Sequence, residues 1–190
     1  MKQSRVSTRT LTSPRTLTPV QITLTDDWQV LREARLAALW TSPESFLARY
    51  ETEVCYREEI WRREISRGDW LVAVDDDSPI GLLGVTPEAD VAPDERFLSY
   101  LWVHPAIRQC GLATILMTTA LTLLGESSIT RVWLWVLDGN HAAWSLYERL
   151  GFDRTGPRQP IPHDPSRHEE RLAVSLRRAD SSLQDGRNDV

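Results

Sequence analysis

The chain has 190 residues, of which 41% are hydrophobic and 26% charged, as is typical of one globular domain with a substantial core. Its formal net charge is −5, and because residues 1–19 carry four positive charges and no negative one, the remainder has a net charge of −9. This acidic body argues against nucleic-acid binding, and the sequence contains no apolar run near the roughly 20 residues that span a membrane.

The two ends of the chain are predicted to lie outside the domain. Residues 1–19 are rich in Ser, Thr, Arg and Pro and have no hydrophobic period, so they predict a disordered tail without a secretory signal. Residues 179–190 predict a polar C-terminal tail, which leaves residues 20–178 as the domain. Cys55 and Cys110 form no close pair in the sequence, which predicts no disulfide framework, no metal site and a reducing cytoplasm.

Hydrophobic periodicity predicts both strands and helices within the domain. Apolar runs bounded by turn residues predict strands at residues 20–24, 69–74, 80–86, 97–103, 131–137 and 170–176. Helical spacing and capping residues predict helices at residues 28–40, 43–49, 56–66, 112–124 and 140–150. The Pro- and His-containing segment 156–169 predicts a loop. This order predicts a single α/β (α+β) domain, with a mixed, mostly antiparallel central sheet of six to seven strands and helices on both faces.

The most informative segment joins the predicted strand 97–103 to the predicted helix 112–124. From Leu101 to Ala113 it reads Leu-Trp-Val-His-Pro-Ala-Ile-Arg-Gln-Cys-Gly-Leu-Ala. A helix that begins there presents free backbone N–H groups and the positive end of its dipole, and Gly111 lets a ligand approach closely. The segment therefore predicts an anion site, although it has neither the spacing of a P-loop nor that of a dinucleotide fingerprint.

The segment resembles the pyrophosphate motif V-x-P-x-x-R-x-x-G-x-A/G of the GNAT N-acetyltransferase superfamily. The motif positions are occupied by Val103, Pro105, Arg108, Gly111 and Ala113. A second segment similar to the family occupies residues 140–152 and reads Asn-His-Ala-Ala-Trp-Ser-Leu-Tyr-Glu-Arg-Leu-Gly-Phe. The two segments follow in the family's order, separated by a predicted helix and a predicted strand. The resemblance covers roughly residues 20–178 and is sharpest over residues 101–152.

The resemblance implies that acetyl-CoA is a co-substrate and that no metal is needed. Backbone donors of the loop and of the first helical turn would bind the pyrophosphate, and the main chain of the preceding strand would bind the pantetheine arm. Asn140 would cap its helix and bond the cofactor arm, while Ala143 would leave room for that arm. The predicted cofactor-binding residues are Leu101, Trp102, Val103, Arg108, Gln109, Cys110, Gly111, Leu112, Ala113, Thr114, Asn140, Ala143 and Tyr147.

Tyr147 and Glu95 are the predicted catalytic residues. The resemblance places the Tyr147 hydroxyl near the thioester sulfur, where a phenol with a reference pKa of ~10 can protonate a departing thiolate of pKa ~8.5. The alternative for Tyr147 is a buried aromatic side chain with a satisfied hydroxyl. A glutamate common in similar enzymes aligns with Phe97 here, and this departure leaves the general base open. Glu95 is the substitute candidate, with a solvated loop carboxylate as its alternative, and His104 is a further candidate.

Several other side chains carry two interpretations. His163 and His168 would border the acceptor site but, as loop histidines, are also expected to be solvated. Cys110 is expected to contribute its backbone, with a nucleophilic thiol as the alternative. Aromatic residues of the early helices would wall the acceptor pocket in this family and could hold a cation or a ring, with core packing as the alternative. These are Trp40, Tyr50, Tyr56 and Trp61.

The resemblance predicts an N-acetyltransferase that acts by direct attack in a ternary complex. The acceptor would be a primary amine of a protein lysine, a protein N-terminus or a small molecule, and the protein would be a monomer or homodimer. Two alternatives stay open: transfer of a longer acyl group, and a catalytically silent acetyl-CoA-binding sensor or scaffold.

Overall fold

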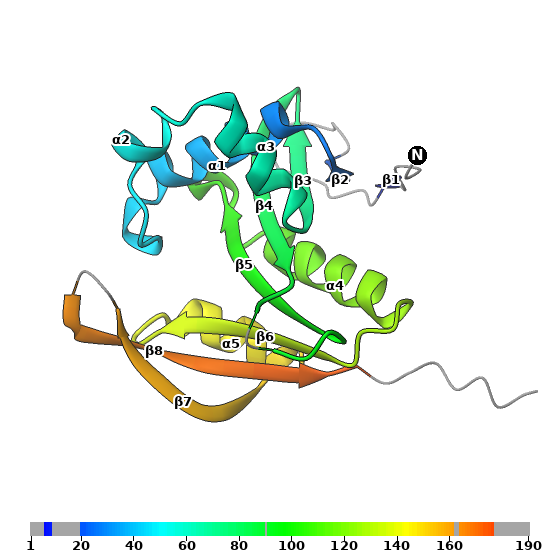
Figure 1. The fold of residues 1–190 in the computed structure, drawn as a ribbon, viewed down its shortest axis with the longest axis vertical. Coiled ribbons are helices and arrows are strands. Elements are labelled where there is room, and N and C mark those ends of the chain that lie inside the picture. The colour runs from blue at the N-terminus through cyan, green and yellow to red at the C-terminus, as the bar shows by residue number, and fades with distance from the viewer. Residues whose placement is uncertain (1–5, 9–19, 90, 162–163, 177–190) are drawn as a thin grey trace, which may run out of the picture.

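An eight-stranded sheet forms the centre of the fold in the computed structural model, which describes residues 6–8, 20–89, 91–161 and 164–176 (Figure 1). Neighbouring strands are antiparallel except for β5 and β6, which are parallel. This confirms the predicted mixed, mostly antiparallel sheet. In spatial order the strands are β1 (Val6–Thr8), β2 (Gln21–Thr25), β3 (Asp69–Asp75), β4 (Ser78–Thr86), β5 (Glu95–Val103), β6 (Arg131–Leu137), β8 (Asp164–Ser175) and β7 (Asp153–Ile161).

Helices cover both faces of the sheet, as predicted. The side chains of α1 pack on one face of β3, β4 and β5, and those of α4 and α5 pack on the other face. Within the described ranges, no helix is both long and apolar enough to cross a membrane. The helical elements are α1 (Trp28–Thr41), η1 (Pro43–Ser45), α2 (Tyr50–Glu53), α3 (Glu58–Ser66), η2 (Pro105–Ile107), α4 (Leu112–Gly125) and α5 (His141–Arg149).

The central strands read as continuous apolar runs because both of their faces are covered. In β3, Trp70 and Val72 belong to the cluster beneath α1, whereas Leu71 and Ala73 belong to the cluster beneath α4. Successive side chains of a strand point to opposite faces, so a strand between two helical layers needs apolar residues at every position. Asp27 is the N-cap of α1, and its side chain accepts a hydrogen bond of 2.8 Å from the backbone N–H of Gln29.

Three local expectations differ from the structure. The loop expected at residues 156–169 is wrong, because β7 and β8 form a hairpin there. The prediction of a helix at residues 43–49 is also wrong, because a single turn, η1, is followed by the short helix α2. Val6–Thr8 pair with β2 within the tail expected to be disordered. The rest of that tail, the C-terminal tail and His163 lie outside the described residues.

The position of β7 at the edge of the sheet explains why it was missed. An edge strand tolerates proline, since one side of its backbone needs no partner. Pro157 and Pro160 both lie in β7, and most of its side chains are exposed. The sequence consequently has the composition of a loop although the chain pairs as a strand.

A buried ion pair joins α1 to α2. Arg35 donates to both carboxylate oxygens of Glu53 at 2.8 and 3.0 Å, and the two side chains are 6% and 9% exposed. Removing one partner of such a pair leaves a buried charge uncompensated, at a typical cost of about 3–5 kcal/mol.

We therefore expect Glu53→Ala to lower the free energy of unfolding by about 3–5 kcal/mol in urea titrations. Glu58→Ala is the matched control, because it removes a pair with Arg62 whose side chains are 51% and 60% exposed. The control should cost less than about 1 kcal/mol. Equal, small losses in both variants would contradict the burial of the Arg35–Glu53 pair.

Candidate active site

A cleft opens where β5 and β6 part. Glu95–Phe97 of β5 pair with Arg131–Trp133 of β6, and the ladder between the two strands ends there. Beyond this point the two arms of the sheet diverge (Figure 1). A cavity of about 210 Å³, which we call the strand cleft, lies between them. Its lining includes Ser99, Tyr100 and Leu101 of β5, Trp135 of β6, and Asn140, Ala143 and Tyr147 at the start and within α5.

A β-bulge lies in β5 beside the strand cleft. Gly84 of β4 opposes Ser99 and Leu82 opposes Trp102, so that Tyr100 and Leu101 together face one residue of β4. Tyr100 has a φ of 60°, which is uncommon for a residue other than glycine. A bulge leaves its extra residue outside the ladder. Main-chain groups of β5 are therefore available beside the strand cleft.

The chain after β5 leads to an uncapped helix N-terminus. Gly111 is the N-cap of α4 with a φ of 85°, and no side chain of the described residues bonds the first turn as a cap. A Cβ at Gly111 would meet no described atom within 4 Å, so the space in front of the helix is open. Such an end presents unpaired N–H groups and a positive partial charge. Its geometry suits the binding of an anion.

Arg108 fixes the loop that leads to this helix. Its Nε donates to the Val103 carbonyl oxygen at 3.2 Å, and its Nη2 donates to the hydroxyl of Ser42 at 2.6 Å. Ser42 is fully buried at the end of α1. The guanidinium thus ties the end of β5 to α1. The exposed thiol of Cys110 contacts the carbonyl of Ile107 within the same loop.

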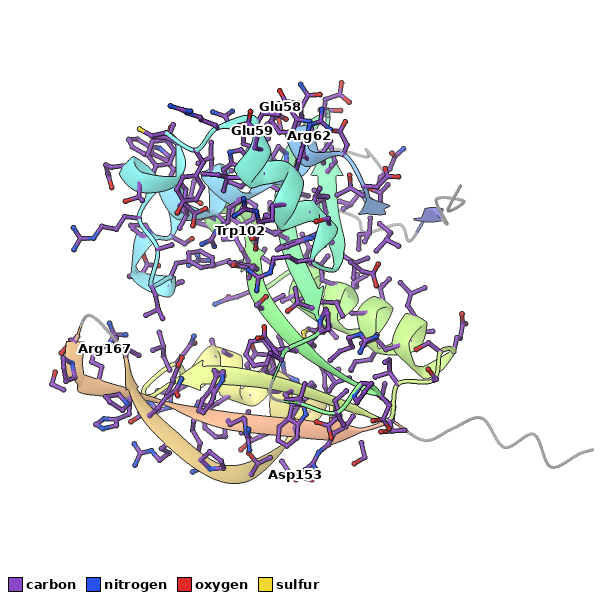
Figure 2. All side chains as sticks on the ribbon, viewed as in Figure 1. Glu58, Glu59, Arg62, Trp102, Asp153 and Arg167 are labelled. Atoms are coloured by element: carbon purple, nitrogen blue, oxygen red, sulfur yellow. The ribbon has the colours of Figure 1, made fainter. Side chains whose placement is uncertain are left out.

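The side chains of β5 pack in the core and leave its backbone for other contacts. Trp102 is 3% exposed, and its indole donates to the hydroxyl of Thr41 at 3.2 Å. Figure 2 shows Trp102 extending from β5 towards the layer of the early helices. His104 caps η2, because its Nδ1 accepts from the backbone N–H of Ala106 at 3.3 Å. This bond occupies the ring nitrogen that a general base would need.

One face of α5 completes the strand cleft. Asn140 caps the helix by accepting from the Ala143 N–H at 3.2 Å, and both residues line the cleft together with Tyr147. Tyr147 is 7% exposed, and its ring packs against Phe152. Burial raises the pKa of Tyr147 to about 12. With this pKa the phenol keeps its proton at neutral pH and can donate it.

The structure separates Glu95 from this group of residues. Its carboxylate accepts a hydrogen bond from the Trp133 indole at the closed end of the β5–β6 opening, and it is not part of the cleft lining. Glu169 of β8 does line the cleft and accepts from the Gln159 amide at 2.8 Å. Sequence reasoning missed Glu169 because it expected a loop there. The sequence does carry a signal that could have placed Glu169. Glu170, Leu172 and Val174 alternate along the strand and face α5, so Glu169 lies on the opposite face.

A second, wider cavity adjoins the strand cleft. It has a volume of about 470 Å³ and is bordered by residues 39–51 and by the end of the β7–β8 hairpin. We call it the outer groove; it shares Phe46 and Leu47 with the strand cleft. Trp40 in its wall is 68% exposed. Figure 2 shows Arg167 at the hairpin end, on the side where the segment between α1 and α2 lies.

The charges of the outer groove favour a cation slightly. Three carboxylates line it, from Glu44, Glu51 and Asp164, against the guanidinium groups of Arg49 and Arg167. Trp40 and Tyr50 meet edge to face with ring centroids 5.1 Å apart. Among the described residues, no cluster of His, Cys, Asp and Glu could hold a metal ion.

Comparisons with known proteins agree with this geometry. A family model described as the acetyltransferase (GNAT) family matches residues 30–152. The [ribosomal protein bS18]-alanine N-acetyltransferase of Salmonella typhimurium is 30% identical over 86 residues, which are 45% of this chain and 58% of that protein. The chain thus matches little more than half the length of this relative.

Solved structures share the fold. The ribosomal-protein-S18-alanine N-acetyltransferase of Escherichia coli is 18% identical with a TM-score of 0.59, and the match covers 96% of this chain and all of that one. A GNAT-family acetyltransferase of Streptococcus pneumoniae is 15% identical with a TM-score of 0.65, over 83% of this chain and 99% of that one. At such identities the likeness establishes the fold alone.

Proposed function

The chain belongs to the acetyltransferase (GNAT) family, and from this premise we propose that it transfers the acetyl group of acetyl-CoA to a primary amine. One observation carries the proposal: a short loop joins the open, uncapped N-terminus of α4 to β5, and the bulged part of β5 lines the strand cleft together with the buried phenol of Tyr147. The helix N-terminus is suited to a diphosphate and the phenol to a thiolate leaving group.

Acetyl-CoA binding would use mostly backbone groups. The N–H groups of the first turn of α4 and of the loop at Gln109–Gly111 would bond the diphosphate, and Gly111 would let it approach. The main chain of Leu101–Val103 would bond the pantetheine arm, which would pass Asn140 and the small Ala143. The buried side chains of Leu112 and Trp102 support this division, since their packing leaves the backbone for the ligand.

The reaction would be a direct acyl transfer. The amine nitrogen forms a bond to the acetyl carbon to give a tetrahedral oxyanion, and the bond between that carbon and sulfur then breaks. Backbone N–H groups near the bulge at Tyr100 would stabilise the oxyanion, and Tyr147 would donate its proton to the departing sulfur. An amine of reference pKa ~10.4 must lose a proton before attack. Glu95 is the base expected from the sequence, and Glu169 is the carboxylate that lines the cleft.

The acceptor is proposed to be the amine of a peptide or protein. The outer groove is open, has an exposed tryptophan and carries one more negative than positive charge in its lining. These features suit the cationic end of an extended peptide acceptor. The two ribosomal-protein alanine N-acetyltransferases act on a protein amine, as their names state.

We also propose that the protein acts in the cytoplasm, because Cys55 and Cys110 are exposed free thiols.

The test is thiol release from acetyl-CoA by the purified full chain. The amine panel contains a peptide with a free N-terminal alanine, a peptide with a free lysine side chain and an acetylated N-terminus, a polyamine and an aminoglycoside. We expect turnover with a peptide, confirmed by a mass increase of one acetyl group. Calorimetric binding of acetyl-CoA without turnover on any amine would favour the silent sensor, and turnover restricted to a longer acyl-CoA would favour the other alternative.

A further inference from the structure

A charged side chain lies among the core residues of α1. The buried residues of this helix are Leu31, Ala34, Arg35, Leu36, Ala38 and Leu39. Arg35 is 5% exposed, and the two carboxylate oxygens of Glu53 neutralise its guanidinium. Apolar residues of similar volume often replace such a pair without loss of stability, so the pair is weak evidence for a purely structural role. The other contacts of the guanidinium therefore bear on what it does.

The guanidinium of Arg35 lies over two aromatic rings that line the strand cleft. Its Cζ is 4.3 Å from the centroid of the Tyr100 ring and 4.9 Å from the centroid of the Phe46 ring. Tyr100 belongs to the bulge of β5, and Phe46 is shared by the strand cleft and the outer groove. A planar guanidinium packs well on aromatic faces. One buried cation thus joins α1 to two parts of the cleft wall.

The backbone of Tyr100 depends on what holds its side chain. A φ of 60° is disfavoured for a residue with a Cβ and persists only where the surrounding structure enforces it. The Tyr100 ring packs against the Trp70 ring with centroids 5.3 Å apart, and its hydroxyl donates to the Glu64 carboxylate at 3.5 Å. Gly84 leaves the necessary space, because a Cβ there would approach the Tyr100 ring to 3.1 Å. Together with Arg35, these contacts fix the ring and with it the bulge.

We propose that Arg35 is a positioning residue for acyl transfer, because its guanidinium fixes Tyr100 and Phe46 and thereby the bulge of β5 in the wall of the strand cleft. The inference rests on the proposed function, in which backbone N–H groups near the bulge bind the oxyanion. A displacement of about 1 Å can cost on the order of a hundredfold in rate, since the donors must meet the developing charge. Arg35 itself does not line the strand cleft.

A double variant separates this role from stability. Arg35→Met combined with Glu53→Leu removes both charges and keeps a similar volume, so we expect the fold to be retained. Glu58→Leu combined with Arg62→Met is the matched control. This pair is exposed, and Arg62 lies over the Trp28 ring at 5.5 Å, but none of the three residues lines the strand cleft.

A conservative variant tests the shape of the cation. Arg35→Lys keeps a positive charge beside Glu53, so it keeps the charge balance of the core. Its ammonium lacks the planar group that packs on the rings of Tyr100 and Phe46. We therefore expect Arg35→Lys to behave between wild type and the double variant in both tests below.

The first test measures the backbone of the bulge. In NMR spectra of the ¹⁵N-labelled full chain, the scalar coupling between the amide and α protons of Tyr100 reports its φ. We expect this coupling to move towards the value of an extended strand in Arg35→Met with Glu53→Leu, and to keep its wild-type value in the control pair. An unchanged coupling in the double variant would overturn the proposal. If the double variant does not fold, an unchanged coupling in Arg35→Lys would overturn it.

The second test measures turnover with the best acceptor of the amine panel. Arg35→Met with Glu53→Leu should lower kcat roughly ten- to a hundredfold. The dissociation constant for CoA, which has no acetyl carbonyl, should stay within about twofold of wild type. A general loss of structure would weaken CoA binding as well, so this split identifies positioning. An equal kcat in wild type and the double variant would contradict the proposal.

The two proposals fail in different measurements. Absence of acetyl-CoA binding in calorimetry would overturn the proposed function and leave the coupling measurement at Tyr100 intact. A Tyr100 coupling that does not respond to the loss of Arg35 would overturn the positioning role and leave acetyl-CoA binding intact.

Discussion

Replacing Gly111 with Asp is expected to weaken acetyl-CoA binding by at least about a hundredfold. A carboxylate at the N-terminus of α4 would occupy the space that is open in front of the helix. It would also accept hydrogen bonds from the N–H groups that we assign to the diphosphate. Two like charges about 5 Å apart repel by roughly 3 kcal/mol at an effective dielectric constant of about 20, which corresponds to a factor above one hundred. Isothermal calorimetry of the full chain measures the effect.

The variant should stay folded although it loses its ligand. A φ of 85° strains any residue other than glycine, but a negative charge near a helix N-terminus offsets part of that cost. Gly156→Asp is the matched control, because Gly156 also has a positive φ of 95° and open space around its Cβ position, but lies in β7. Gly111→Ala separates backbone strain from charge. Unchanged binding in Gly111→Asp would contradict the assignment of the diphosphate site.

The elements around the candidate site could be predicted because their signals are local. Pro105 and Gly111 mark the loop between β5 and α4, and Asn140 marks the start of α5. Apolar runs that end at these residues need no knowledge of distant partners. The sequence therefore indicated where the backbone donors and Tyr147 lie along the chain.

The cleft itself depends on pairing between distant strands. The ladder between β5 and β6 ends at Phe97, and the bulge at Tyr100 is defined against β4. Neither feature has a local signal in the sequence, because the register of a strand depends on the residues of the opposite strand. The same reason separates Glu95 from the cleft and brings Glu169 to it. The sequence places Glu95 near the motif, while the pairing of Glu169 with Leu137 decides which carboxylate lines the opening.

Replacing Tyr147 with Phe is expected to lower kcat roughly a hundred- to thousandfold, the usual contribution of a positioned general acid. The dissociation constant for acetyl-CoA should stay within about twofold of wild type, because the change removes one oxygen from a packed ring. Initial rates of thiol release, with binding measured separately, distinguish the two constants.

The leaving group offers a sharper control. If Tyr147 protonates the departing thiolate, the reaction of an acetyl donor with a more acidic thiol, such as a thiophenyl ester, depends less on this proton transfer. The ratio of wild-type to Tyr147→Phe rates should then fall markedly with that donor. A ratio that does not depend on the thiol would assign Tyr147 a packing role.

The alkaline stability of the protein provides an independent measure of the same buried phenol. Its pKa rises from 10.0 to about 12 on folding, so the folded chain keeps a proton that the unfolded chain loses above pH 10. The stability that follows is fully present below pH 10.0 and is lost as the pH rises towards 12. At about 1.4 kcal/mol for each pH unit, the loss reaches up to about 3 kcal/mol. Urea midpoints of Tyr147→Phe should therefore fall less steeply than those of wild type over this range. Equal slopes of the urea midpoint against pH in the two proteins would mean that the Tyr147 hydroxyl is solvated. A solvated hydroxyl would contradict the buried position that we assign to the proton donor.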